Sequence, residues 1–262
     1  MENKTLEVKP VEEKAVDAKS KKEKLTPILI LLENSINVWW KNLKKFVQIY
    51  LLSILYSIIP LIIIIVGSFV IPIFYKNGIG LLFTLVIGIL FLLSAIIALY
   101  FFIRSYVATF LFIKNDYKSE PKNVFKEAKN FIVPYIAVSF LTVILVILWT
   151  FLLIIPGIIY SILYSFAVYV FFFEGKTGMA ALKRSKELVK GYWWAVAGRF
   201  FLLALIMWIF GIIISIPMFF VPEESLVYEL WSMFTQIINI LVGPVALLFS
   251  YQIYQDLVKI KK

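Results

Sequence analysis

Two clusters of basic side chains recur at helical spacing beside long apolar runs. The first consists of Lys41, Lys44 and Lys45, and the second of Lys183, Arg184, Lys186 and Lys190. A lysine or arginine near an anionic membrane leaflet is stabilised by roughly 1 kcal/mol. We therefore expect these seven residues to contact anionic lipid. The alternative is that they only orient the chain in the membrane, as basic inner loops do.

A different chemistry would come from polar side chains within the apolar runs. Gln236 and Asn239 are three residues apart, so they lie on one face of a helix at membrane depth. Polar side chains in this setting often hydrogen-bond between helices. The pair is therefore predicted to join helices, with binding of a solute as the alternative.

Residue types needed for most catalytic chemistry are missing. The chain contains no histidine and no cysteine, which removes the commonest general base, the commonest metal ligand and every thiolate site. After residue 24 the only adjacent carboxylates are Glu223 and Glu224, and no GxxxxGK[ST] phosphate loop occurs. We expect no enzyme activity, no metal and no cofactor.

Composition indicates what must position these residues. The 262 residues are 62% hydrophobic and 16% charged, the balance of a membrane protein. We expect an all-α, polytopic membrane helical bundle over residues 25–262. Residues 1–24 are rich in charge and lack aromatic side chains, which predicts a disordered cytoplasmic tail.

Apolar runs predict about six transmembrane helices, with turns between them that include Lys76-Asn77-Gly78, Pro156-Gly157 and residues 221–224. The runs are residues 46–75, 79–103, 131–155, 158–173, about 194–220 and about 230–251. The fourth is short for a membrane span, so whether it fully crosses is left open. Residues 252–262 are predicted to be a short polar tail.

An amphipathic segment precedes the first, third and fifth runs. In the last of these, one face carries Ala181, Leu182, Ser185, Leu188, Val189 and Tyr192, and the basic residues lie opposite. We expect interfacial helices in the headgroup plane; packing on the bundle is the alternative. Aligning Ser35, Ala128 and Ser185 brings the three segments into register, which predicts a threefold repeat of interfacial helix, span, outer turn and span.

Charge placement predicts the orientation of the spans. Of the 26 lysines and arginines, only Lys76 lies in a predicted outer turn, and the last outer turn carries Glu223 and Glu224. By the positive-inside rule both termini are expected in the cytoplasm of a multi-pass cell-membrane protein. This placement also explains the net charge of +10 without nucleic acid as a partner.

Residues 156–194 carry a set of short motifs in a fixed order. They are Pro156-Gly157-Ile158, Glu174-Gly175, ALKRS at 181–185, ELVKG at 187–191 and Trp193-Trp194. This stretch resembles the membrane domain of membrane-anchored glycerophosphoryl diester phosphodiesterases. The resemblance implies the membrane architecture alone, because the accompanying catalytic domain uses histidine and metal-bound carboxylates and has no counterpart here.

These features together favour a non-enzymatic integral membrane protein, a lipid-interacting or membrane-organising module acting through its basic interfacial helices. Its expected partners are membrane lipids and another membrane protein. The alternative is a small transporter or permease subunit, since repeats and proline-interrupted helices suit that class. Against it, the spans lack the paired charges that mark an ion path. An intramembrane enzyme is the third possibility.

Overall fold

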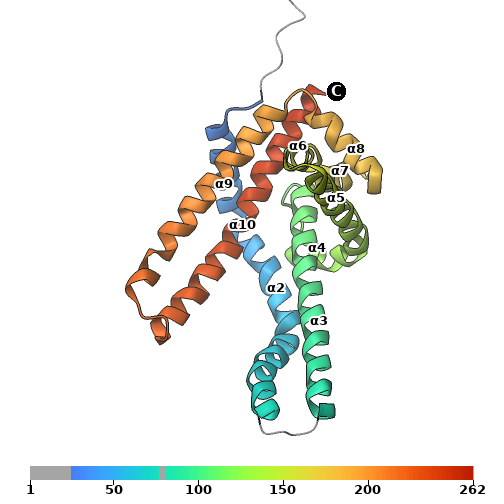
Figure 1. Cartoon of the computed structure of the whole chain (residues 1–262). Helices are drawn as coiled ribbons and strands as arrows, with labels where there is room; N and C mark the ends of the chain where they lie inside the picture. The colour runs from blue at the N-terminus through green and yellow to red at the C-terminus, as the bar shows by residue number, and fades with distance from the viewer. Residues whose placement is uncertain (1–24, 77–80, 262) are drawn as a thin grey trace, which may run out of the picture.

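The computed structural model describes residues 25–76 and 81–261, which form helices joined by short turns (Figure 1). Six of the described helical segments are long and apolar enough to cross a membrane. The predicted all-α membrane bundle is thus confirmed. The predicted tail at 1–24 and residues 77 and 78 of the first predicted turn lie outside the described residues.

The helices group into three successive units. The first holds α2 (Ile28–Lys76) and α3 (Leu81–Lys114). The second holds α4 (Pro121–Ala128), η2 (Lys129–Phe131), α5 (Ile132–Leu152), α6 (Ile154–Tyr164) and α7 (Ala167–Glu174). The third holds α8 (Gly178–Val189), α9 (Trp193–Ser215), η3 (Ile216–Phe220) and α10 (Leu226–Ile260).

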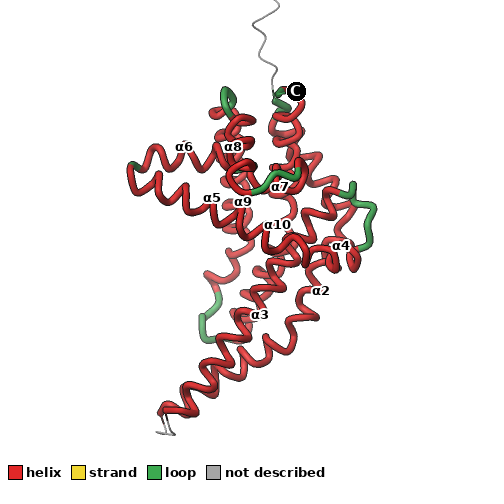
Figure 2. The backbone as a smooth tube through the Cα atoms, turned by 90° about the vertical axis from the view of Figure 1, so that its right-hand side faces the viewer, coloured by secondary structure: helices red, strands yellow, loops and turns green. Residues whose placement is uncertain are grey.

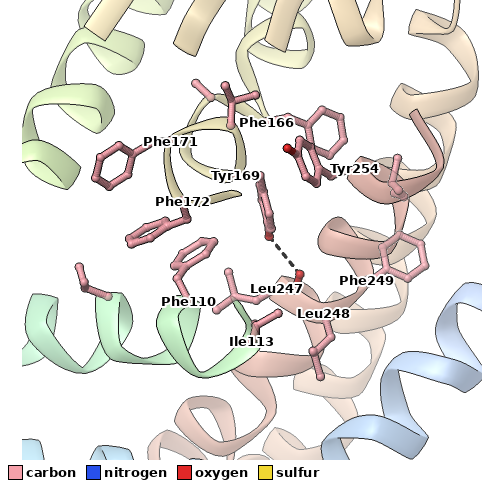
Figure 3. Close-up of a cluster of buried hydrophobic side chains, with 14 of the residues drawn as sticks. Phe110, Ile113, Phe166, Tyr169, Phe171, Phe172, Leu247, Leu248, Phe249 and Tyr254 are labelled. Atoms are coloured by element: carbon pink, nitrogen blue, oxygen red, sulfur yellow. Dashed lines mark hydrogen bonds between the residues drawn. The ribbon is translucent and has the colours of Figure 1, made fainter. Parts of the chain in front are cut away.

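Each unit contributes one long hairpin, and the three hairpins diverge from a shared core. Figure 1 shows α2–α3 and α9–α10 leaving the core in different directions, and Figure 2 shows α5–α6 leaving it in a third. The core lies where the last helices of the three units meet (Figure 3). There the ring of Phe110 stacks on that of Phe172 at 4.7 Å, and the Tyr169 hydroxyl donates to the Leu247 carbonyl at 3.0 Å.

The first helix of each unit packs on the last helices of the preceding unit. Helix α4 packs on α3, α8 packs on α6 and α7, and α2 packs on α10. The last contact joins the first unit to the third and closes a ring. The three register positions Ser35, Ala128 and Ser185 are all fully buried, which agrees with the predicted threefold repeat. A small residue at each position lets the helix approach its neighbour closely.

The amphipathic helices differ from the prediction in two respects. The segment at 25–45 is not a separate interfacial helix, because α2 runs without a break from Ile28 to Lys76. The apolar face of α8 is covered by protein: Ala181, Leu182, Ser185, Leu188 and Val189 are buried, and Tyr192 is half-buried. Packing on the bundle, the alternative, is therefore the arrangement that α8 adopts. The apolar face of α8 thus packs against protein, where a lipid surface was expected.

The fourth span also departs from the prediction. The turn before it is at Leu153, whose backbone is extended (φ −162°, ψ 138°), and Pro156 and Gly157 lie inside the first turns of α6. Gly157 is the point of closest approach between α5 and α6: a Cβ there would overlap Thr150 Oγ1 and come within 2.8 Å of the Thr150 Cα. The span extends over Ile154–Glu174 and is interrupted at Ser165 and Phe166, between α6 and α7.

The end of the chain is part of the fold. Helix α10 continues to Ile260, so the polar tail predicted at 252–262 is wrong as far as the structure describes it. Ile253, Tyr254 and Leu257 are buried in the core. Their spacing of one to four residues places them on one face of the helix. The polar residues between them gave this segment the composition of a polar tail, which is why the sequence did not indicate a helix.

Candidate functional site

The basic cluster on α8 is exposed on the side away from the bundle. Lys183, Lys186 and Lys190 have exposed side chains, and the Lys186 ammonium lies 5.1 Å from the centre of the Tyr160 ring. With the apolar face of α8 packed on protein, these three lysines form part of the exposed surface of α8 and its C-terminal end.

Arg184 differs from its neighbours because it is held inside the fold. Its Nε donates to both carboxylate oxygens of Glu174, at 3.2 and 3.0 Å, and Glu174 Oε1 also accepts from the Tyr254 hydroxyl at 3.1 Å. This network joins α7, α8 and α10. The charge of Arg184 is thus paired with a carboxylate inside the fold, and a contact of Arg184 with lipid stays a prediction.

The cluster on α2 also contains both exposed cations and a cation that is held inside the fold. Lys41 and Lys44 are exposed. Lys45 is partly buried: its ammonium donates to the Tyr117 carbonyl at 2.7 Å and lies 5.5 Å from the centre of the Phe112 ring. Lys45 therefore ties α2 to the loop between α3 and α4 and contributes positive charge there.

That loop and α2 enclose a groove of about 870 Å³. Its polar end is formed by Lys44, Lys45 and Gln48 of α2 together with Lys118 and Lys122. Its apolar wall is formed further along α2 by Leu51, Leu52, Ile54, Leu55 and Ile58. Lys44 and Lys45 were among the predicted lipid contacts, whereas Lys118 and Lys122 were not. The sequence does show that the stretch at 114–130 is rich in lysine. That this stretch lies against α2 is seen only in the fold.

The loop holds an unusual backbone conformation beside the groove. Asp116 and Tyr117 both adopt positive φ angles, 51° and 63°, a region that non-glycine residues rarely occupy and that costs free energy. The bond from Lys45 to the Tyr117 carbonyl helps to fix this turn. Burial raises the pKa of the Tyr117 phenol to about 12, so this side chain stays neutral next to the lysines.

The predicted polar pair faces outward. Gln236 and Asn239 are both exposed on α10, and Gln236 Nε2 donates to Ser232 Oγ in the same helix at 3.4 Å. Within one chain the pair therefore does not join two helices. A role between chains or toward a solute stays a prediction.

Two further arginines donate hydrogen bonds to backbone carbonyls of other segments. Arg199 Nη2 donates to the carbonyls of Leu25 and Thr26, at 3.1 and 2.7 Å. Arg104 Nε donates to the Phe125 carbonyl at 2.8 Å. Each arginine thus fixes the segment that enters a neighbouring unit. Sequence reasoning could locate these charges but not their partners.

Within residues 25–76 and 81–261, no group of three histidine, cysteine, aspartate or glutamate side chains could hold a metal ion. Comparison of the chain with protein-family models, with curated proteins and with solved structures found no match.

Proposed function

We propose that the chain is a non-enzymatic membrane protein that binds anionic lipid through the basic surface around its core. One observation carries the proposal: four lysines outside the groove are exposed close in sequence to exposed tryptophans. The lysines are Lys41, Lys183, Lys186 and Lys190. Trp40 and Trp194 are 69% and 83% exposed, and tryptophan favours the level of the lipid headgroups. Cations at that level attract anionic headgroups.

In this proposal the surface faces the cytoplasm of the cell and both chain termini lie on that side. The charge distribution supports it, since Lys76 is the only basic residue in a predicted outer turn. Contacts between the two ends of the chain support a shared side. The Thr26 amide donates to the Asp256 carboxylate at 3.0 Å, so the start of the described chain is bonded to the final helix.

The likeness of residues 156–194 to the membrane domain of glycerophosphoryl diester phosphodiesterases enters the proposal as a shared architecture. Supporting it, two of the motif segments contact one another, since Glu174 pairs with Arg184, and a third places Gly157 at the crossing of α6 with α5. These motif residues thus stabilise the fold, which fits a domain that is defined by its membrane architecture. We assign the protein a role in organising lipid or a membrane-protein partner.

The experiment replaces Lys41, Lys183, Lys186 and Lys190 with glutamine and measures lipid around the protein. The chain is reconstituted in nanodiscs of phosphatidylglycerol and phosphatidylcholine, and lipid that stays bound on detergent extraction is quantified by mass spectrometry. The wild type should be enriched in phosphatidylglycerol over the bulk mixture, and the variant should be less enriched than the wild type. A wild type that shows no enrichment would make the proposed function wrong.

A second function, a small transporter or permease subunit, is favoured by one feature. A cavity of about 400 Å³ lies between the hairpins and is lined by Tyr106, Tyr135, Tyr169, Ser165 and Ser250 among other uncharged residues. A pocket at such a junction suits a small neutral solute. It offers no charged group to couple transport to an ion, so lipid binding remains the leading proposal.

A further inference from the structure

The groove between α2 and the loop before α4 has the polarity of a phospholipid. Lys44, Gln48, Leu51, Leu55 and Ile58 are spaced three or four residues apart, so they form one stripe along α2. The stripe begins with a cation and ends with aliphatic side chains. Lys44 and Ile58 are about 21 Å apart along the axis, given the rise per residue of an α-helix.

The aliphatic part of the stripe is open to the outside of the fold. Leu51, Leu55 and Ile58 are 54%, 62% and 49% exposed, although they line the wall of the groove. An extended acyl chain lying there would cover apolar surface along the direction in which α2 enters the membrane. A water-soluble anion would make no contact with that apolar wall, and this favours a lipid as the occupant.

The polar end of the groove carries a surplus of positive charge. Lys44, Lys118 and Lys122 are exposed there, and Lys45 adds a partly buried ammonium. One carboxylate, that of Glu120, lines the same end. Four cations against one anion favour an occupant with net negative charge. The N-terminus of α4 at Pro121 also opens here and adds a weak positive potential.

The other two units of the repeat lack these cations. In the register that aligns Ser35 with Ala128 and Ser185, the positions of Lys44 and Lys45 are occupied by Ala137 and Val138 in the second unit, and by Trp194 and Ala195 in the third. The repeated architecture therefore does not require lysine at these positions. Lys44 and Lys45 are therefore specific to the first unit.

We infer that this groove is a discrete site for one anionic glycerophospholipid. The phosphate lies among Lys44, Lys118 and Lys122, and one acyl chain follows Leu51, Leu55 and Ile58 toward the middle of the span. The inference rests on the proposed function and narrows it from a diffuse basic surface to a single binding site. It also gives Lys44 a different role from that of Lys41 and the α8 lysines.

The test measures retention of phosphatidylglycerol by the full-length protein in detergent, using native mass spectrometry. The wild type should retain one lipid after extensive washing. Replacing Lys44 and Lys122 together with glutamine should weaken binding by about tenfold or more, since two headgroup contacts are lost. Leu55→Trp should also expel the lipid, because it fills the apolar wall while all the lysines remain. Unchanged retention in both groove variants would overturn the inference.

Matched controls separate this site from general attraction to lipid. Replacing Lys183 and Lys186 with glutamine removes the same charge from α8 and should leave the single retained lipid in place. Equal losses in the α8 and groove variants would leave the proposed function standing and overturn the discrete site. Excess inorganic phosphate should not displace the lipid. Displacement by phosphate alone would show an anion site without lipid specificity, which also overturns the inference. Thermal unfolding of each variant confirms that the fold is intact.

Discussion

Ser185 shows how a single small side chain can hold an interrupted membrane span together. Its hydroxyl is fully buried, donates to the Leu163 carbonyl at 2.7 Å and accepts from the Phe166 amide at 3.1 Å. Both backbone groups lie at the break between α6 and α7. A fully buried position offers no water to satisfy such groups, so the serine of α8 takes the place of the missing helical hydrogen bonds.

We predict that Ser185→Ala destabilises the protein by about 1–3 kcal/mol, because two buried backbone groups lose their partner. The measurement is thermal or denaturant unfolding of the detergent-solubilised protein. Ser161→Ala is the matched control, since the Ser161 hydroxyl donates only to the Ile158 carbonyl of its own helix and its loss should have little effect. Equal effects of the two substitutions would contradict the assigned role of Ser185.

At the scale of the helices, sequence alone predicts most of the architecture but not the exact turns or the contacts between helices. Long apolar runs located the six spans because hydropathy is a property of each segment by itself. The turn at Leu153 was misplaced to Pro156-Gly157, because proline is tolerated in the first turn of a helix and glycine also serves close packing. The pairing of Arg184 with Glu174, and of α2 with Lys118 and Lys122, depends on the fold and leaves no local signal.

The crossing of α5 and α6 gives a prediction at this scale. Gly157→Ala should destabilise the protein by about 1–3 kcal/mol, because the added methyl group meets the backbone of Thr150 at the crossing. Gly198→Ala in α9 is the control, since a Cβ there meets nothing within 4 Å and alanine favours a helix over glycine. Unfolding midpoints compare the two variants. A Gly157→Ala protein as stable as the wild type would mean that the two helices are not in close contact.

For the whole molecule, the closed ring constrains how the three hairpins can sit in a membrane. The start of α2 is bonded to α9 and α10 through Arg199 and Asp256, while each hairpin leads away from the core (Figures 1 and 2). A hairpin whose two helices both cross the membrane starts and ends on the same side, so three crossing hairpins place their tips together on one side. The segments at the core, including Ser119 and Thr177, then share the other.

We predict that single cysteines at Leu153 and Glu223 react with a membrane-impermeant thiol reagent in intact cells, whereas cysteines at Ser119 and Thr177 do not. The chain has no native cysteine, so each signal has no background from other sites. Leu153 is the decisive position because it lies at the tip of α5–α6, the hairpin that includes the interrupted fourth span. Protection of Leu153 with labelling of Glu223 would mean that α6 and α7 enter the membrane without crossing it. Labelling of Ser119 from outside would contradict the orientation of the whole ring. Permeabilised cells, in which all four cysteines should react, provide the control for accessibility.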